Sequence, residues 1–230
     1  MPPQDLMAST QHSIKMFGHR FPKTSMLWLK PHLPHFIDHS QAAFIKIRHI
    51  SSNIVVTLEI IHSFTLKNWQ QQAFLLKLDL AKAFDRLEWN FIASTLRRLG
   101  LHNHFIRLIH ACISTPTFSI LVNGEASESL FPNCGVRQGC PLSPYLFVVA
   151  TNELSISLQH ELHNSNLTGD TLGPGYPPLY SLLFADNLIL CGQVTKQEAT
   201  TINTILNNFY NRSSQVKKEL CNTIIFQIHA

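Results

Sequence analysis

Two aspartates that interrupt apolar segments are the residues best suited to chemistry in this sequence of 230 residues. Asp79 lies in LLKLDL and Asp186 lies in LLFADN. A buried carboxylate costs free energy unless it is paired or binds a metal ion. Mg²⁺ takes one or two carboxylates together with substrate phosphates, and two such ions about 3.5–4 Å apart clamp the oxygens of a phosphoryl transfer. If the strand ends bring Asp79 and Asp186 together, the pair suits that chemistry.

A simpler interpretation stays open for each aspartate. Asp186 and Asn187 stand between two apolar runs, which is typical of a hairpin turn, because both residue types tolerate positive φ. Asp79 can pair with Lys77 or Lys82, which are close in sequence. Spacing alone therefore does not decide between a metal site and ordinary structural roles.

Two sets stand out among the 13 histidines, His32, His35 and His39 in one and His102 and His104 in the other. Zinc sites combine histidines with cysteines or carboxylates at short, regular spacing. Neither set has such a companion, so we do not expect a metal site at either.

Composition and charge narrow the function classes. With 45% hydrophobic residues, 15 Phe and only 14% charged residues, the chain is not disordered. Residues 1–115 carry 13 Lys and Arg against 6 Asp and Glu, whereas residues 116–230 carry 5 against 8. The basic half predicts either a polyanionic partner such as nucleic acid or an ordinary solvated face.

Membrane and secretory signals are lacking in the sequence. No apolar run approaches the roughly 20 residues of a membrane span, and no signal peptide opens the chain. The five cysteines form no CxxC pair, which fits a reducing compartment. We therefore expect no membrane partner and a nuclear or cytoplasmic location.

Hydrophobic periodicity predicts an α+β domain. The proline-rich residues 1–35 predict an irregular lead-in, and the interleaved elements of residues 36–230 predict a mainly antiparallel sheet with helices on one face. Ser143 is the expected N-cap of the longest helix, with Pro144 in its first turn. The expected helices cover about 52–66, 88–99, 102–114, 143–162 and 196–211, and the expected strands 73–80, 117–123, 128–132, 179–184, 188–191 and 223–228.

Three sequence blocks together resemble a known family. They are KLDLAKAFDRLEW (77–89), GVRQGCPLSPYLF (135–147) and LLFADN (182–187). In this order they resemble the reverse transcriptase of non-LTR (LINE-type) retrotransposons, especially the plant forms, over about residues 30–226. The resemblance implies a palm domain with partial fingers, and in a departure from the family we expect no thumb. It also implies RNA-directed DNA polymerisation with two Mg²⁺ ions, an RNA template, a DNA primer and deoxynucleoside triphosphates.

The resemblance assigns roles to residues around the nucleotide. Phe84 would stand beside the incoming sugar, where its ring excludes a 2′-OH. Arg137, Gln138 and Gly139 would form the loop that supports the nascent base pair and the template. Gly139 would let the backbone approach the nucleotide closely.

The catalytic turn departs from the family pattern. Asp79 and Asp186 would be the metal ligands, but Asn187 stands where the family has a second aspartate. Asn187 is neutral and offers only a carbonyl oxygen, so the field that holds Mg²⁺ is weaker. The resemblance thus predicts a truncated, partly degenerate polymerase of weak or no activity, and the alternative is a non-catalytic nucleic-acid-binding remnant.

Two further positions bear on the same prediction. Lys46 and Arg48 are the expected residual phosphate contacts of the fingers. Ser214, just after the expected helix over about 196–211, stands where the family has a glycine.

Overall fold

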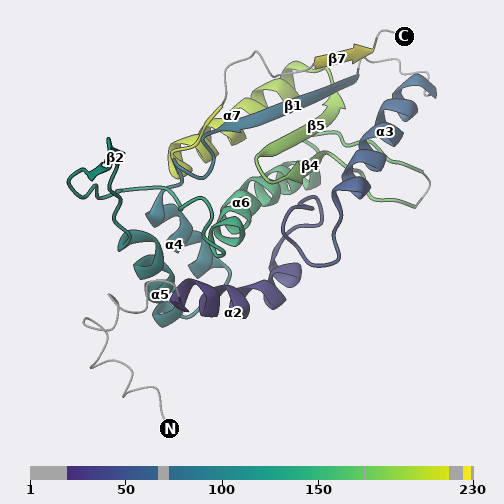
Figure 1. Cartoon of the computed structure of the whole chain (residues 1–230). Coiled ribbons are helices and arrows are strands. Elements are labelled where there is room, and N and C mark those ends of the chain that lie inside the picture. The colour runs from purple at the N-terminus through teal and green to yellow at the C-terminus, as the bar shows by residue number, and fades with distance from the viewer. Residues whose placement is uncertain (1–19, 67–72, 174, 218–224, 229–230) are drawn as a thin grey trace.

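A five-stranded antiparallel sheet forms the centre of the fold (Figure 1). The computed structural model describes residues 20–66, 73–173, 175–217 and 225–228. Strand order is β4-β5-β1-β6, and β7 also pairs with β1. The strands are β1 (Ala73–Ala81), β4 (Ser181–Phe184), β5 (Asn187–Gln193), β6 (Val216–Lys217) and β7 (Ile225–Ile228).

Six helices surround this sheet among the described residues. They are α2 (Arg20–Phe36), α3 (Ile50–Leu66), α4 (Trp89–Arg98), α5 (Asn103–Ser114), α6 (Ser143–His163) and α7 (Lys196–Ser213). A small separate hairpin, β2 (Leu121–Val122) and β3 (Glu125–Ala126), projects from the body (Figure 1). Its strands are shorter than those expected about Gly124. The α+β class with an antiparallel sheet is confirmed.

The two faces of β1 have different neighbours. Leu78 and Leu80 belong to the main core, together with buried residues of α4, α6 and α7. Leu75, on the opposite face, lies in a smaller core with Ile60 of α3. Because side chains alternate along a strand, Asp79 lies on the same face as Leu75, four residues beyond it. Helices α4, α6 and α7 therefore cover one face of the sheet. On the opposite face, which carries Asp79, α3 packs near Leu75, at the end away from Asp79.

The expected irregular lead-in over residues 1–35 is wrong where the structure describes it. Helix α2 runs through this segment and contains two prolines. Such prolines cost about 3 kcal/mol each in a helix interior. Leu29 and Leu33, at helical spacing, are fully buried and pack into the main core, and each contributes about 1.5–3 kcal/mol. Residues 1–19 lie outside the described residues.

The start of α6 also differs from the expectation. Pro144 lies in the first turn as predicted, but Leu142 occupies the N-cap position without a side-chain cap. Ser143 is therefore not the cap. Its hydroxyl donates instead to the Arg137 carbonyl oxygen at 2.7 Å. This bond ties α6 to the loop that precedes it.

Replacing Ser214 with glycine is expected to stabilise the fold. Ser214 ends α7 in the left-handed conformation, with φ of 56°, which costs a residue with a side chain about 1 kcal/mol. We expect the melting temperature to rise by about 2–4 °C, measured by circular dichroism. The control Thr204→Gly, in the exposed interior of the same helix, should lower it. A lower melting temperature for Ser214→Gly would contradict the prediction.

A buried carboxyl in the first turn of α7 makes stability depend on pH. Glu198 is only 2% exposed, and its Oε1 accepts the Thr168 N–H at 3.0 Å. Burial raises the pKa of Glu198 above its ordinary value of 4.5. The folded state therefore binds the proton more tightly than the unfolded chain. This contribution to stability is complete below the ordinary pKa and is lost as pH rises through the raised one.

Replacing Glu198 with glutamine should remove this loss. Glutamine keeps an acceptor for Thr168 and carries no charge, so we expect the free energy of unfolding at pH 8 to rise by about 1–2 kcal/mol. Urea titrations at pH 5 and pH 8 measure the change. The exposed control Glu128→Gln should leave the pH dependence as it is. A variant Glu198→Gln with an unchanged pH slope would refute the assignment.

Candidate active site

The register of β1 against β5 brings the two predicted metal ligands together. Asp79 is the direct cross-strand partner of Asn187, and Asp186 precedes Asn187 in the turn. The Leu80 N–H donates to the Asp186 carbonyl oxygen at 3.1 Å. From standard spacings, the Cα atoms of Asp79 and Asp186 lie within roughly 9 Å of each other. All three polar residues are partly accessible.

The side chain of Asn187 interacts with its neighbour. Its Nδ2 donates to Asp186 Oδ1 at 3.0 Å. Where a second carboxylate would repel Asp186, the amide binds it. Among the described residues, no three His, Cys, Asp or Glu side chains form a group suited to a metal ion. Two carboxylates with substrate phosphates still match the ligands that Mg²⁺ takes, so Asp79 and Asp186 fit the ion.

The hairpin turn that carries Asp186 is supported from outside the sheet. Ala185 has a positive φ of 52°, a conformation that such two-residue turns usually give to glycine. Its N–H donates to Gln41 Oε1 at 3.3 Å. Gln41 is fully buried and pairs through its backbone with Leu183 of β4. The segment before α3 therefore fixes the position of the turn.

Arg48 holds that supporting segment in shape. Its guanidinium donates to the carbonyl oxygens of Asp38, Gln41 at 2.7 Å and Ile37 at 2.9 Å. These bonds use both terminal nitrogens within the loop. The expected phosphate contact of Arg48 is therefore replaced by a structural role. Lys46 is exposed, and its phosphate contact stays a prediction.

The first two sequence blocks are hydrogen-bonded to each other. The Gly135 N–H donates to the Leu87 carbonyl oxygen and the Val136 N–H to that of Phe84, both at 2.8 Å. Gly135 has a φ of 82°, and a Cβ there would lie 2.4 Å from the Asp85 carbonyl oxygen. Only glycine fits this approach.

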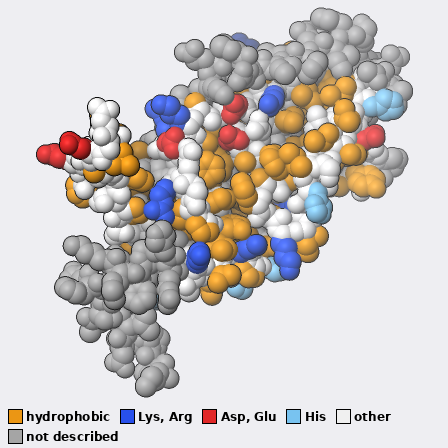
Figure 2. All heavy atoms as spheres, in the orientation of Figure 1, with side chains coloured by type: hydrophobic (Ala, Val, Ile, Leu, Met, Phe, Trp, Pro, Cys, Tyr) orange, Lys and Arg blue, Asp and Glu red, His pale blue; other side chains and the backbone are white. Residues whose placement is uncertain are grey.

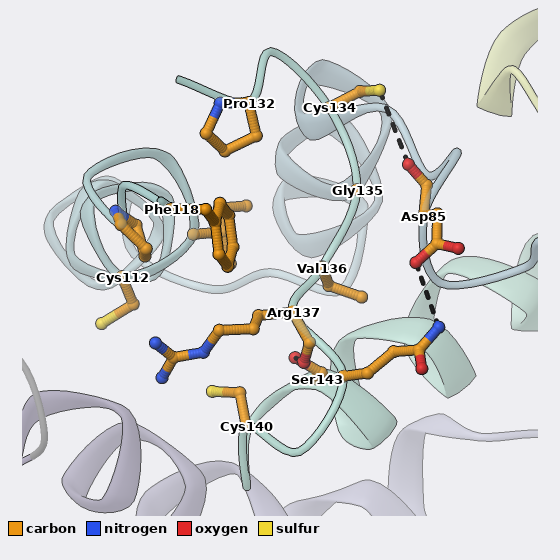
Figure 3. A pocket seen from close by; sticks show the side chains of 13 residues that line it. Asp85, Cys112, Phe118, Pro132, Cys134, Gly135, Val136, Arg137, Cys140 and Ser143 are labelled. Atoms are coloured by element: carbon orange, nitrogen blue, oxygen red, sulfur yellow. Dashed lines mark hydrogen bonds between the residues drawn. The ribbon is translucent and has the colours of Figure 1, made fainter. Parts of the chain in front are cut away.

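The loop side chains Arg137 and Gln138 make different contacts, and Figure 3 shows Arg137 pointing toward Cys112 and Cys140. Gln138 Nε2 donates to Asp85 Oδ1 at 3.1 Å. Arg137 extends instead into a pocket of about 410 Å³, where Cys112 and Cys140 are also found. Arg137 and Gln138 thus line the same pocket with different side-chain contacts, and their joint role at the template stays a prediction.

Gly139 and Phe84, both expected beside the nucleotide, have different surroundings in the structure. Gly139 has a φ of 79°, and no protein atom lies within 4 Å of the Cβ it lacks. Phe84 is partly buried and stacks on Phe147, with ring centroids 4.9 Å apart. Phe84 therefore packs against the main core, and its contact with a sugar stays a prediction.

Three residues that position the site were not expected from the sequence. Asp85 orients Gln138. Trp89 donates from Nε1 to the Gly135 carbonyl oxygen at 2.7 Å. Gln41 holds the turn that carries Asp186. Asp85 and Trp89 lie within the first sequence block, whereas Gln41 lies outside all three blocks.

Comparison with known families decides the identity of the fold. The family described as "Reverse transcriptase (RNA-dependent DNA polymerase)" matches residues 18–224. The chain belongs to this family. The reverse transcriptase assignment predicted from the three sequence blocks is thereby confirmed.

Known relatives of this reverse transcriptase come from retrotransposons. A Pol polyprotein of the type-1 retrotransposable element R2 of Popillia japonica is 35% identical over 136 residues, covering 59% of the chain and 18% of the relative. A protein of transposon TX1 of Xenopus laevis is 28% identical over 171 residues, 74% of the chain and 12% of the relative. The non-LTR assignment is confirmed. The chain spans only 18% and 27% of two matching R2 polyproteins.

Solved structures show the same reverse transcriptase fold. Apo telomerase from Candida tropicalis superposes with a TM-score of 0.62 at 11% identity, over 100% of this chain and 45% of that one. Telomerase from Candida albicans in complex with an RNA fragment gives 0.65 at 12% identity, over 96% and 36%. None of the helices in the described part of the chain has the length and apolar character of a membrane span.

Proposed function

We propose that this reverse transcriptase domain adds deoxynucleotides to a DNA primer paired with an RNA template, at the site of Asp79 and Asp186. The supporting observation is the β1–β5 register, which puts both carboxylates at one end of the sheet. Bound Mg²⁺ would neutralise the triphosphate and favour attack by the primer 3′-OH, with pyrophosphate as leaving group.

The side chains around the carboxylates would position the substrates. Gln41 holds the backbone of the turn, so that Asp186 stays beside β1. Phe84, held by its stack on Phe147, presents a flat wall to the sugar. The open space at Gly139 admits the nucleotide close to the backbone.

Activity should be weak because of Asn187. Its amide is bonded to Asp186, and the site carries one negative charge fewer than two adjacent carboxylates would give. We also propose a plant lineage for this degenerate copy. An uncharacterised mitochondrial protein of Arabidopsis thaliana, 37% identical over 67 residues, is in keeping with that origin.

Primer extension tests the proposal. A labelled DNA primer on an RNA template is incubated with deoxynucleotides and Mg²⁺ or Mn²⁺. We expect slow extension that stops when EDTA removes the cation. Extension that continues in EDTA would contradict a metal-dependent site at Asp79 and Asp186.

Replacing Phe84 with valine should weaken sugar discrimination. The smaller side chain leaves room for a 2′-OH, and a change of this size in a pocket alters specificity by about 10- to 200-fold. The measurement is the ratio of deoxynucleotide to ribonucleotide incorporation in single-nucleotide extension. The control Phe131→Val changes a phenylalanine that is 78% exposed on a separate segment and should leave the ratio unchanged. An unchanged ratio for Phe84→Val would exclude the sugar contact.

A second candidate function, nucleic-acid binding without catalysis, is favoured by the excess of basic residues in the first half of the chain. It predicts salt-sensitive binding to RNA or DNA that needs no divalent cation. EDTA separates the two functions, since it would abolish extension and leave this binding intact.

A further inference from the structure

Members of the two histidine sets, which are far apart in sequence, lie on or beside two helices that pack together, α2 and α5. His32 and His35 are exposed on α2, and His104 lies in the first turn of α5 after His102. The two helices are in contact through Trp28 and Phe105, whose ring centroids are 4.5 Å apart. We call the outer surface of these helices the α2–α5 face.

The α2–α5 face carries basic residues without acidic ones. Neither Arg20–Phe36 nor Asn103–Ser114 contains an aspartate or glutamate. Lys23, Lys30 and Arg107 are exposed on it. Figure 2 shows Lys, Arg and His side chains among hydrophobic ones over the lower part of the molecule, where α2 lies, with the Asp and Glu side chains elsewhere in this view.

Acidic groups on adjoining segments leave the α2–α5 face positively charged. Asp38 follows α2, and its carboxylate accepts the Ser40 N–H at 2.8 Å and a bond from Gln159. On α6, Glu153 pairs with Arg98 at 2.6 Å, next to α7. No group of three ligating side chains suited to a metal occurs in the described ranges. The face therefore has the charge of a site for polyanions.

An exposed aromatic ring distinguishes this face from a solvated basic surface. Trp28 remains 48% exposed, although it packs on Phe105 and also contacts His32 at 4.9 Å between centroids. Leu27, beside it, is 65% exposed. A tryptophan that packs on a neighbouring ring and is still about half exposed is suited to stacking with an unpaired base.

We infer that the α2–α5 face binds single-stranded nucleic acid, with a base stacked on Trp28 and phosphates at Lys23, Lys30 and Arg107. Stacking needs unpaired bases, so a duplex or an acidic protein fits the face less well. The inference agrees with the proposed function on the kind of partner, but it does not depend on Asp79 or Asp186. RNA and DNA share this chemistry, and the test compares them.

Fluorescence anisotropy with labelled 12-residue oligouridine and oligothymidine tests the aromatic contact. Loss of a stacked base weakens binding by about tenfold or more, so Trp28→Ala should bind at least tenfold more weakly than wild type. Trp28→Phe keeps a ring and should stay within about threefold. The matched control is Phe131→Ala, an exposed aromatic elsewhere, which should not change the affinity.

Salt titration tests the charge contact on the same oligonucleotides. For single strands each phosphate contact contributes about 0.7 to the slope of log K against log salt. The double variant Lys23→Gln and Lys30→Gln should lower that slope by about 1.4. Lys196→Gln, exposed on α7, is the control and should leave it unchanged.

Three outcomes would overturn the inference. The first is Trp28→Ala and the lysine variant binding within twofold of wild type with the same salt slope, while their melts show intact folds. The second is equal binding of a duplex, and the third is full competition by polyglutamate. Binding by Asp79→Asn should equal wild type, so a failed polymerase and a failed binding face give different results.

Discussion

Replacing Asp79 with asparagine is expected to lower deoxynucleotide incorporation by about 10³-fold or more. Asp79 is one of two carboxylates at the paired ends of β1 and β5, with no third in an equivalent position among the residues that the structure describes. Stabilisation by a bound dication is worth several kcal/mol in the transition state, and each 1.4 kcal/mol is a factor of ten. Single-nucleotide extension in Mn²⁺ gives the rate.

The control for Asp79→Asn is Glu125→Gln, which removes one charge from the projecting β2–β3 hairpin. It should extend primers at the wild-type rate. Calorimetric titration with Mn²⁺ adds a readout that works even when extension is slow: binding should be lost in Asp79→Asn and kept in Glu125→Gln. Equal Mn²⁺ affinity in both variants would show that Asp79 is not a ligand.

Replacing Asn187 with aspartate is expected to raise incorporation by about tenfold or more. It should also make the protein less stable than wild type without a divalent cation and more stable than wild type with one. In wild type the amide donates to Asp186 at 3.0 Å. An aspartate loses this bond and repels Asp186, so without a divalent cation the melting temperature should fall by about 2–4 °C. With Mn²⁺, the added charge attracts the dication by about 1–3 kcal/mol at the dielectric of a protein surface, so the melting temperature should exceed that of wild type.

Asn187→Ala is the matched control for this change. It removes the same bond to Asp186 without adding charge, so it should be less stable than wild type both with and without Mn²⁺. A melting temperature of Asn187→Asp that does not respond to Mn²⁺ more strongly than wild type would refute the role given to the missing charge.

The local elements of this fold were predictable because their patterns are local. The apolar run that ends at Asp79 became β1, and the run that ends before Asp186 became β4, with bounds within two residues. The register between them was not readable from either run. It depends on the pairing of β1 with β5, which joins residues more than a hundred positions apart.

Other features depend on tertiary contacts that override local preference. Helix α2 forms despite two prolines because Leu29 and Leu33 are buried. Arg48 looked available for phosphate, but the fold directs its guanidinium to three main-chain carbonyl groups. The Ser143 hydroxyl donates to a carbonyl oxygen of the preceding loop and does not cap its own helix. In each case, contacts with residues distant in the fold outweigh the local preference of the sequence.

The residues expected to face the nucleotide were also predictable only in part. The family resemblance implied a close approach of the backbone to the nucleotide at Gly139, and the structure leaves space there. Arg137 and Gln138 line one pocket, yet their contacts differ, because Asp85 accepts a hydrogen bond from Gln138. Sequence gives the residue types of such a loop, whereas the direction of each side chain depends on the elements packed beside it.

Anomalous diffraction from crystals soaked in Mn²⁺ tests the shared carboxylate site most directly. We expect a peak between the side chains of Asp79 and Asp186, and its disappearance in crystals of Asp79→Asn. A peak elsewhere with none at this position, or carboxylates that diverge to opposite sides of the sheet, would contradict the account.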